Sequence, residues 1–335
     1  MIYILTPLIR LNKSSYLRRM LGKITRAHWL LHFIVFIWGW SPIIGKAIET
    51  QALQLVWFRM TITILALLVF FLIKKESLMS NPKKIMILCG IGGIIAFHWF
   101  CFYHAIKVSN VSITLVGFST GTIFTAIIEP LFYKRRIILY ELFFGMIIIG
   151  AIAMIMYQDL TANTQIKSLH EKHVNFSLGI IYGMLAAFTS SLFTVFNGIL
   201  VRTTTSTVIT FYELGGGLIF LSLYILINGG FSAKENDNFF VLPYWDYFYL
   251  SILAIVGTAF PFIASTNLLK KISPYTMTLT VNLETVYGIL LAAVLFKEHR
   301  QLTPLFYGAT AIILCVILLN AVLKNYLSRR AALPS

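Results

Sequence analysis

Apolar residues in this chain occur in long runs rather than at every third or fourth position. Runs of about 20 residues alternate with short polar segments such as 74–84 and 228–246. A helix needs about 20 mostly apolar residues to cross a bilayer, and lipid offers backbone polar groups no partner outside a helix. The pattern therefore predicts ten membrane-spanning helices, near residues 28–47, 51–73, 85–106, 109–133, 137–157, 176–200, 205–228, 247–269, 273–296 and 303–323.

Composition supports the same fold class. Of the 335 residues, 58% are hydrophobic and 12% are charged, with a mean hydropathy of +0.83. Soluble domains contain about 25% charged residues. The net charge of +15 does not indicate nucleic-acid binding, because Lys and Arg lie between the apolar runs rather than on one face. The sequence thus predicts an all-α integral membrane protein surrounded by the lipid bilayer, with no nucleic-acid partner.

Lys and Arg are unequally divided between alternate polar segments. The set that includes both chain ends holds 19 of them and the other set holds 7. Cytoplasmic loops carry such an excess, so we expect a multi-pass protein of the cell (inner) membrane with both termini in the cytoplasm. Residues 1–27 would form a cytoplasmic extension, 158–175 an extracytoplasmic loop and 324–335 a basic cytoplasmic tail. Met1 and Met20 are both candidate start residues.

The chain also repeats itself. Residues 107–136 align with residues 271–300 at an offset of 164, with Lys, Ser, Thr, Phe and Arg at corresponding positions. Each half holds five predicted spans, so the second half enters the membrane in the opposite sense. We therefore expect two inverted five-helix repeats, 28–157 and 176–323. Repeats of this kind commonly surround a substrate site near the membrane midplane.

Glu284 lies in the middle of the ninth predicted span, in the sequence VNLETVYGILL. A charge at that depth costs about 3 kcal/mol on insertion scales, so the side chain should face a cavity, meet a partner or be protonated. We interpret Glu284 and His98 as candidates for both substrate binding and proton coupling, with Asn282 as a further substrate-binding residue. The alternative is that Glu284 is a neutral acid bonded to a neighbouring helix, and His98 fits a structural role equally well.

Arg59 and Glu213 each lie about eight residues into the second span of their repeat. In inverted repeats these positions have similar depths, so we expect a structural ion pair that cancels two costly charges. Direct anion binding by Arg59 is the alternative.

Several residues of the first, third and eighth spans are candidates for shaping the site. Trp38 is a candidate cavity wall, while Gly39 and Pro42 beside it are candidate hinge residues, because they permit a broken helix that exposes backbone groups. Pro261 should bend the eighth span, either as a hinge or as a fixed packing bend. The three aromatic residues near the outer part of the third span are expected in the belt at the membrane surface, namely Trp99, Tyr103 and His104.

Two segments carry a family resemblance. FIWGW followed by VWFRM, and the closing segment from LLKKISP to FKEH, resemble the EamA branch of the drug/metabolite transporter superfamily over about residues 28–323. The resemblance implies a ten-helix transporter of small metabolites, often an exporter. Thr285 stands where the family often has proline after Asn-Leu-Glu, so the ninth helix is expected to bend differently.

The leading functional prediction is a secondary transporter that moves a small organic metabolite or drug by alternating access, with the proton as candidate coupling ion. A membrane-embedded lipid-modifying transferase is the alternative, and it would need clustered catalytic groups where only scattered ones occur. A channel would need rings of like charge or a filter motif. No cofactor or metal is predicted, since the histidines of HEKH at 170–173 have the wrong spacing for a metalloprotease helix. The oligomeric state is left open between monomer and homodimer.

Overall fold

The computed structural model describes residues 26–75, 77–162, 175–231, 233–234, 237–300 and 302–331. The candidate start at Met20, the HEKH sequence and most of the predicted loop 158–175 lie outside these residues. The regular elements of the described residues are helices apart from one short hairpin, which confirms the predicted all-α class.

Nine helices of the described part are long and apolar enough to cross a membrane, and the tenth, α14, has an apolar portion at Pro304–Asn320. The first repeat contains Arg26–Ala47, whose last part is α2 (Ser41–Ala47), then α3 (Ala52–Lys74), α4 (Pro82–Val108), α5 (Val111–Phe118), α6 (Gly121–Tyr133) and α7 (Leu139–Ala162). The second contains α8 (Phe176–Leu200), α9 (Ser206–Ile227), α10 (Tyr244–Ala254), a π-helical turn (Ile255–Ala259), α11 (Phe260–Leu268), α12 (Pro274–Val281), α13 (Leu283–Leu295) and α14 (Pro304–Ala331). The hairpin is β1 (Ala233–Lys234) with β2 (Asp237–Asn238), and a 3₁₀ turn occupies Glu298–Arg300.

All ten predicted spans are present, with boundaries that differ by a few residues. The largest difference is at the end of the chain, where α14 continues to Ala331 into the segment predicted as a tail from residue 324. Large apolar side chains cover the outside of the bundle, for example Leu72 (78% exposed) and Ile227 (82% exposed). In water such a surface would be unfavourable, whereas in a bilayer it faces hydrocarbon. The protein is therefore a multi-pass membrane protein.

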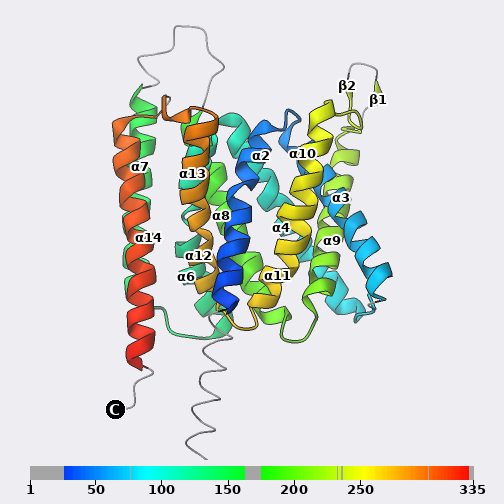
Figure 1. Ribbon diagram of the computed structural model, residues 1–335, viewed down its shortest axis with the longest axis horizontal. Helices are drawn as coiled ribbons and strands as arrows, with labels where there is room; N and C mark the ends of the chain where they lie inside the picture. Colours follow the sequence, from blue (N-terminus) through cyan, green and yellow to red (C-terminus); the bar gives the residue numbers. More distant parts are fainter. Residues whose placement is uncertain are drawn as a thin grey trace, which may run out of the picture.

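Both ends of the described chain lie at one end of the bundle, called here the terminus end. Figure 1 shows α14 finishing at the lower edge and α2 together with the β1–β2 hairpin at the upper edge, called here the opposite end. The fifth and tenth helices, α7 and α14, pack together at one side of the bundle.

The fourth and ninth spans show the inverted repeat most clearly, because both are interrupted near the middle. α5 and α12 have 8 residues each, and α6 and α13 have 13 each. The interruption lies at Ser119–Thr120 in the first repeat and at Asn282 in the second. The structural offset is therefore 163 residues before the interruption and 162 after it, close to the 164 obtained from the sequence.

Small residues allow the closest helix contacts. α4 and α9 pack so tightly that a Cβ added at Gly92 would overlap the Glu213 carbonyl oxygen and lie 2.6 Å from the Gly217 nitrogen. Glycine removes the side chain at such contacts and lets two backbones approach, which is a common way to associate helices in lipid. This contact fixes α9 of the second repeat against α4 of the first.

We expect Gly92→Ala to destabilise the protein by about 1–3 kcal/mol, because the new methyl group must push two helix backbones apart. Gly90→Ala is the matched control, since it lies on the same helix and its added Cβ meets nothing within 4 Å. Thermal unfolding in detergent measures both. Equal unfolding temperatures for the two variants would contradict the close α4–α9 contact.

Candidate functional site

A cavity lies inside the bundle, where helices from both repeats meet. Its wall combines aromatic and aliphatic side chains with a few charged and polar ones, which is typical of sites for small molecules. The four residues predicted to bind substrate, Trp38, His98, Asn282 and Glu284, all line it. Four positions spread over three spans and nearly 250 residues of sequence are thus brought around one space.

Glu284 lies in the first turn of α13, just after the interruption at Asn282, and is 6% exposed. The start of a helix favours a negative side chain because backbone N–H groups there have no partner within the helix. Arg59 of α3 lines the same cavity. The structure describes both side chains and shows no ion pair between them, so the acid and the base face one space separately.

Arg59 is held by aromatic and hydroxyl groups. Its Nε donates to Thr258 Oγ1 at 2.8 Å, in the π-helical turn, and its Nη1 donates to Tyr103 Oη at 2.6 Å. The guanidinium carbon lies 4.0 Å from the ring centroid of Trp99, a cation–π contact. Tyr103 Oη is also 3.2 Å from Ser41 Oγ of α2. The charge is therefore fixed at the cavity wall by α4 and the π-helical turn, and through Tyr103 it is also connected to α2.

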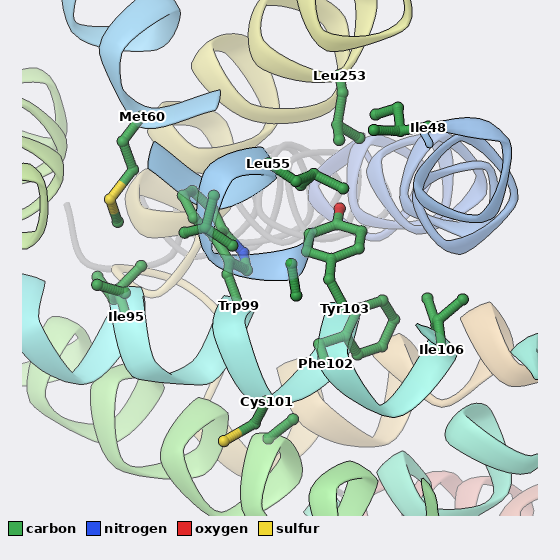
Figure 2. Packing of buried hydrophobic residues seen from close by; sticks show 14 of the residues in the cluster. Ile48, Leu55, Met60, Ile95, Trp99, Cys101, Phe102, Tyr103, Ile106 and Leu253 are labelled. Carbon is green, nitrogen blue, oxygen red and sulfur yellow. The ribbon is translucent and has the colours of Figure 1, made fainter. Parts of the chain in front are cut away.

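Two aromatic residues of α4 correct the sequence prediction. Trp99 and Tyr103 were expected in the belt at the membrane surface, but they are only 5% and 0% exposed. Figure 2 shows both projecting from the same side of α4, toward α3, which carries Leu55 and Met60, with Cys101 on the other side. The belt prediction failed because a buried arginine needs desolvated partners, and an aromatic face provides one without adding charge.

The predicted ion pair of Arg59 with Glu213 is wrong. Glu213 is fully buried, and its Oε2 accepts a hydrogen bond from Asn197 Nδ2 of α8 at 3.1 Å, while Arg59 points to Tyr103 and Thr258. Similar depth in the membrane did not make the two side chains face each other. The reason is that α9 presents Glu213 toward α8, whereas α3 presents Arg59 toward α4 and the π-helical turn.

His98 sits on α4 among phenylalanine rings. Its Nδ1 is 2.8 Å from the Ala186 carbonyl oxygen, which can only accept, so Nδ1 carries a hydrogen and Nε2 is left as the acceptor nitrogen. Ring centroids of Phe193 and Phe118 lie 5.4 and 5.8 Å away. The imidazole thus lines the cavity in a fixed orientation and an apolar setting.

The three predicted hinge residues lie beside irregular backbone. The first span is interrupted at Trp40, between Gly39 and Pro42, and Pro42 occupies the first turn of α2. Pro261 is the second residue of α11, which follows the π-helical turn Ile255–Ala259 directly. Trp38 Nε1 donates to the Gly257 carbonyl oxygen at 3.2 Å, so the two irregular segments are bonded to each other. Wide turns of this kind re-aim side chains and are frequent at functional sites.

The interrupted fourth and ninth spans cross beside the cavity. Asn282 Nδ2 donates to the Ser119 carbonyl oxygen at 3.2 Å, joining the two interruptions, and Thr285 Oγ1 donates to the Leu115 carbonyl oxygen at 3.3 Å. Thr285 replaces the proline of the family pattern, and the ninth span is nevertheless interrupted one turn earlier, at Asn282. The contact between Asn282 and Ser119 therefore ties the centres of the two repeats together.

At the start of each of these spans, backbone N–H groups donate hydrogen bonds to a carboxylate from the other repeat. The sequence prediction missed this feature. Glu298, next to the end of α13, accepts from Val111 N and Ser112 N at 3.0 Å at the start of α5, and lies 3.6 Å from Lys46 Nζ. Such carboxylates satisfy backbone donors that have no partner within the helix. The acid in the FKEH segment of the closing motif was the only sequence signal for this contact.

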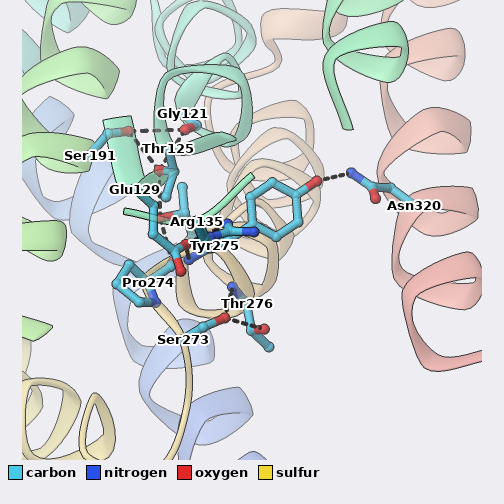
Figure 3. Close-up of polar contacts among 11 residues, drawn as sticks. Gly121, Thr125, Glu129, Arg135, Ser191, Ser273, Pro274, Tyr275, Thr276 and Asn320 are labelled. Atoms are coloured by element: carbon cyan, nitrogen blue, oxygen red, sulfur yellow. Dashed lines mark hydrogen bonds and ion pairs between the residues drawn. The ribbon is translucent and has the colours of Figure 1, made fainter. Parts of the chain in front are cut away.

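The terminus end has the matching contact. Glu129, near the end of α6, accepts from Tyr275 N at 2.8 Å at the start of α12 and pairs with Arg135 at 3.2 Å. Figure 3 shows Tyr275 lying between this pair and Asn320 of α14, whose amide donates to the tyrosine hydroxyl. The two ends of the crossing helices are thus held by the same kind of carboxylate contact.

Comparisons with known proteins identify the same architecture. A family model described as the EamA-like transporter family matches residues 25–157 and 177–322. A protein known from a crystal structure superposes with a TM-score of 0.60, covering 90% of this chain and 99% of its own, at 14% identity, which shows a shared fold alone. No curated protein matches the chain.

We expect Tyr103→Phe to lower stability by about 1–3 kcal/mol, because the buried guanidinium of Arg59 loses an acceptor. Tyr249→Phe is the control, since the structure describes no hydrogen bond of that hydroxyl and the ring is half-buried. Chemical or thermal unfolding in detergent measures the difference. If both variants unfold alike, the Tyr103 hydroxyl does not hold Arg59.

Proposed function

Because the chain belongs to the EamA-like transporter family, we propose that it is a secondary transporter that exports a small organic metabolite or drug across the cytoplasmic membrane by alternating access. The observation that carries this proposal is the cavity at the crossing of the two repeats, where Trp38, His98, Asn282 and Glu284 meet. Inverted-repeat transporters place their substrate sites at such interfaces.

The extent of the cavity supports alternating access. At the terminus end its lining reaches Asn197 and Met277, each within one turn of the nearer end of α8 and α12. Toward the opposite end, the lining stops at Tyr103 and Phe118, more than one turn inside the bundle. The Glu298 contacts with α5 and Lys46 close that end. This state is accessible from the terminus end, and rocking of one repeat against the other would open the opposite end.

The chemistry of the lining suits a solute with both polar and apolar parts. Arg59 and Glu284 supply one group of each charge, and Asn282 supplies an amide. Most of the remaining wall is aromatic or aliphatic, including Phe193 and Phe262. A few placed polar groups in an apolar wall are typical of sites for small molecules.

Glu284 and His98 are the groups that would couple transport to protons. Both are buried in the cavity wall and neither forms an ion pair in the described part of the chain. An acid within the membrane can bind a proton at one face and release it at the other when the cavity changes sides. Exchange of a proton for the solute would then drive export.

The membrane orientation follows from the excess of Lys and Arg in the segments on the terminus side. That excess supports cytoplasmic termini, so the described cavity would be accessible from the cytoplasm. Residues 158–175 would then lie outside the cell. The chain would act as a monomer or a homodimer.

Solute counterflow in proteoliposomes tests the proposed activity. A panel of small metabolites and drugs is offered outside vesicles preloaded with the unlabelled compound, and saturable accumulation of label is the expected result. A modified product instead of unmodified solute would favour the lipid-modifying transferase. Flux that rises linearly with concentration would favour a channel.

We expect Glu284→Gln to abolish flux driven by a pH gradient while leaving expression and folding intact, because glutamine keeps the size but carries no titratable proton. Glu49→Gln is the matched control, an exposed glutamate in the loop before α3. Flux in proteoliposomes with and without an imposed pH gradient measures both. Full activity of Glu284→Gln with an unchanged pH profile would remove Glu284 from the mechanism.

Labelling tests the orientation. In a variant without the three native cysteines, a cysteine at Tyr244 lies at the opposite end of the bundle, 82% exposed. We expect a membrane-impermeant maleimide to label it in intact cells, and to label a cysteine placed after Ser335 only in permeabilised cells. The reverse labelling pattern would show that the protein has the opposite orientation in the membrane.

A further inference from the structure

Glu213 has the surroundings of a proton-binding group rather than of a structural ion. Its side chain is fully buried between helices, and Asn197 Nδ2 is the donor that the structure gives to its carboxyl, at 3.1 Å. The other carboxyl oxygen, Oε1, has no hydrogen-bond partner among the described residues. A buried carboxylate with one amide donor and no cation is far less stable than the neutral acid.

The cations on the helices around α9 are engaged elsewhere. Arg59 of α3 bonds Tyr103 and Thr258. On α4, His98 bonds the Ala186 carbonyl oxygen and Lys84 donates to the Thr203 carbonyl oxygen. The other charged or basic residues of α3 and α4 lie within two turns of the helix ends, namely Lys74, Lys83, His104 and Lys107.

The remaining neighbours of Glu213 carry no positive charge. Cys89 of α4 packs against Gly216, one turn beyond Glu213 on α9. Tyr212, the preceding residue, donates its hydroxyl to the Leu78 carbonyl oxygen. α8 and α11 carry no charged residue or histidine. Within the described chain, therefore, Glu213 is neutralised by no side chain.

Like Glu213, Asn197 has a buried oxygen that receives no hydrogen bond in the described part of the chain. Its Oδ1 is buried and has no donor among the described residues, like Oε1 of Glu213. In the hydrogen-bonded pair of Glu213 and Asn197, the oxygens Oε1 and Oδ1 are thus both acceptors without a donor in the described structure. A proton on the carboxyl supplies one, because a carboxylic acid and a primary amide can form two hydrogen bonds, with one donor on each side.

Asn197 also connects this acid to the cavity. It lines the cavity wall near the terminus end, whereas Glu213 lies behind it. We propose that Glu213 is a second proton-binding site, which gives its proton to water in the cavity, and takes one back from it, when the Asn197 side chain turns aside; the amide itself neither gains nor loses a proton. The inference deepens the proposed proton-coupled transport and, in that respect, rests on it, but the site itself is defined by the acid–amide pair.

Infrared spectroscopy of the purified protein in lipid tests the site without any solute. A protonated carboxyl has its own C=O stretching band, which disappears on ionisation. We expect a band that Glu213→Gln removes, that shifts in Asn197→Ala because the amide hydrogen bond is lost, and that fades in the native protein as the pH is raised. Glu49→Gln, at an exposed glutamate, should leave this band unchanged.

Two results would overturn the proposal. Native and Glu213→Gln spectra that coincide at every pH would show that Glu213 is always ionised. A Glu213 band that persists at every pH would show a proton that is never exchanged. If Glu213→Gln fails to fold, the shift of the band in Asn197→Ala and its pH dependence in the native protein decide the matter.

Asn197→Leu tests the route to the cavity. Leucine is close to asparagine in size and puts an apolar barrier between the acid and the cavity, so we expect the Glu213 band to lose its response to pH in this variant. A response equal to that of the native protein would exclude Asn197 as the link. These outcomes are separate from the transport assay, because a chain that moves no solute could still show the band, and an active carrier could lack it.

Discussion

Polar groups inside a bilayer must find their partners within the protein, and the interior of this bundle is organised by that requirement. Backbone donors at the starts of the two interrupted spans receive carboxylates, Glu298 at α5 and Glu129 at α12. The interruption at Asn282 is bonded to the one at Ser119. Irregular backbone is tolerated at this depth because it faces protein or a cavity. The cavity proposed as the substrate site lies beside these contacts and shares Asn282 with them.

The two end contacts have the same chemistry in different settings. At the opposite end, Glu298 receives two backbone N–H groups and the Ser112 hydroxyl, with Lys46 beside it. At the terminus end, Glu129 receives one backbone N–H group and pairs with Arg135. The first set contains more hydrogen bonds, which agrees with a state closed at the opposite end. During alternating access, one set of contacts would be formed while the other is broken. The reason is that opening one end separates a carboxylate of one repeat from a helix start of the other.

Three of the buried ionisable residues, Arg59, Glu284 and Glu213, differ in the partners that surround them. Arg59 has aromatic and hydroxyl partners, so its charge is retained at the cavity wall. Glu284 lines the cavity. Glu213 has only an amide, which suits a neutral acid. The cation, the acid at the cavity wall and the acid behind Asn197 thus form no ion pair with one another in the described structure, and each has a different electrostatic setting.

The ten spans and their division into two inverted halves could be predicted from the sequence, because a long apolar run has few physical solutions in lipid. The four residues predicted to bind substrate, Trp38, His98, Asn282 and Glu284, line one cavity, while their binding role stays a prediction. The partners became known from the folded structure: Arg59 with Tyr103, Glu213 with Asn197, and Glu298 with the start of α5. Depth along a helix can be counted from the sequence, but the direction of a side chain around the helix axis depends on which neighbours pack against it, and glycines such as Gly92 set that packing.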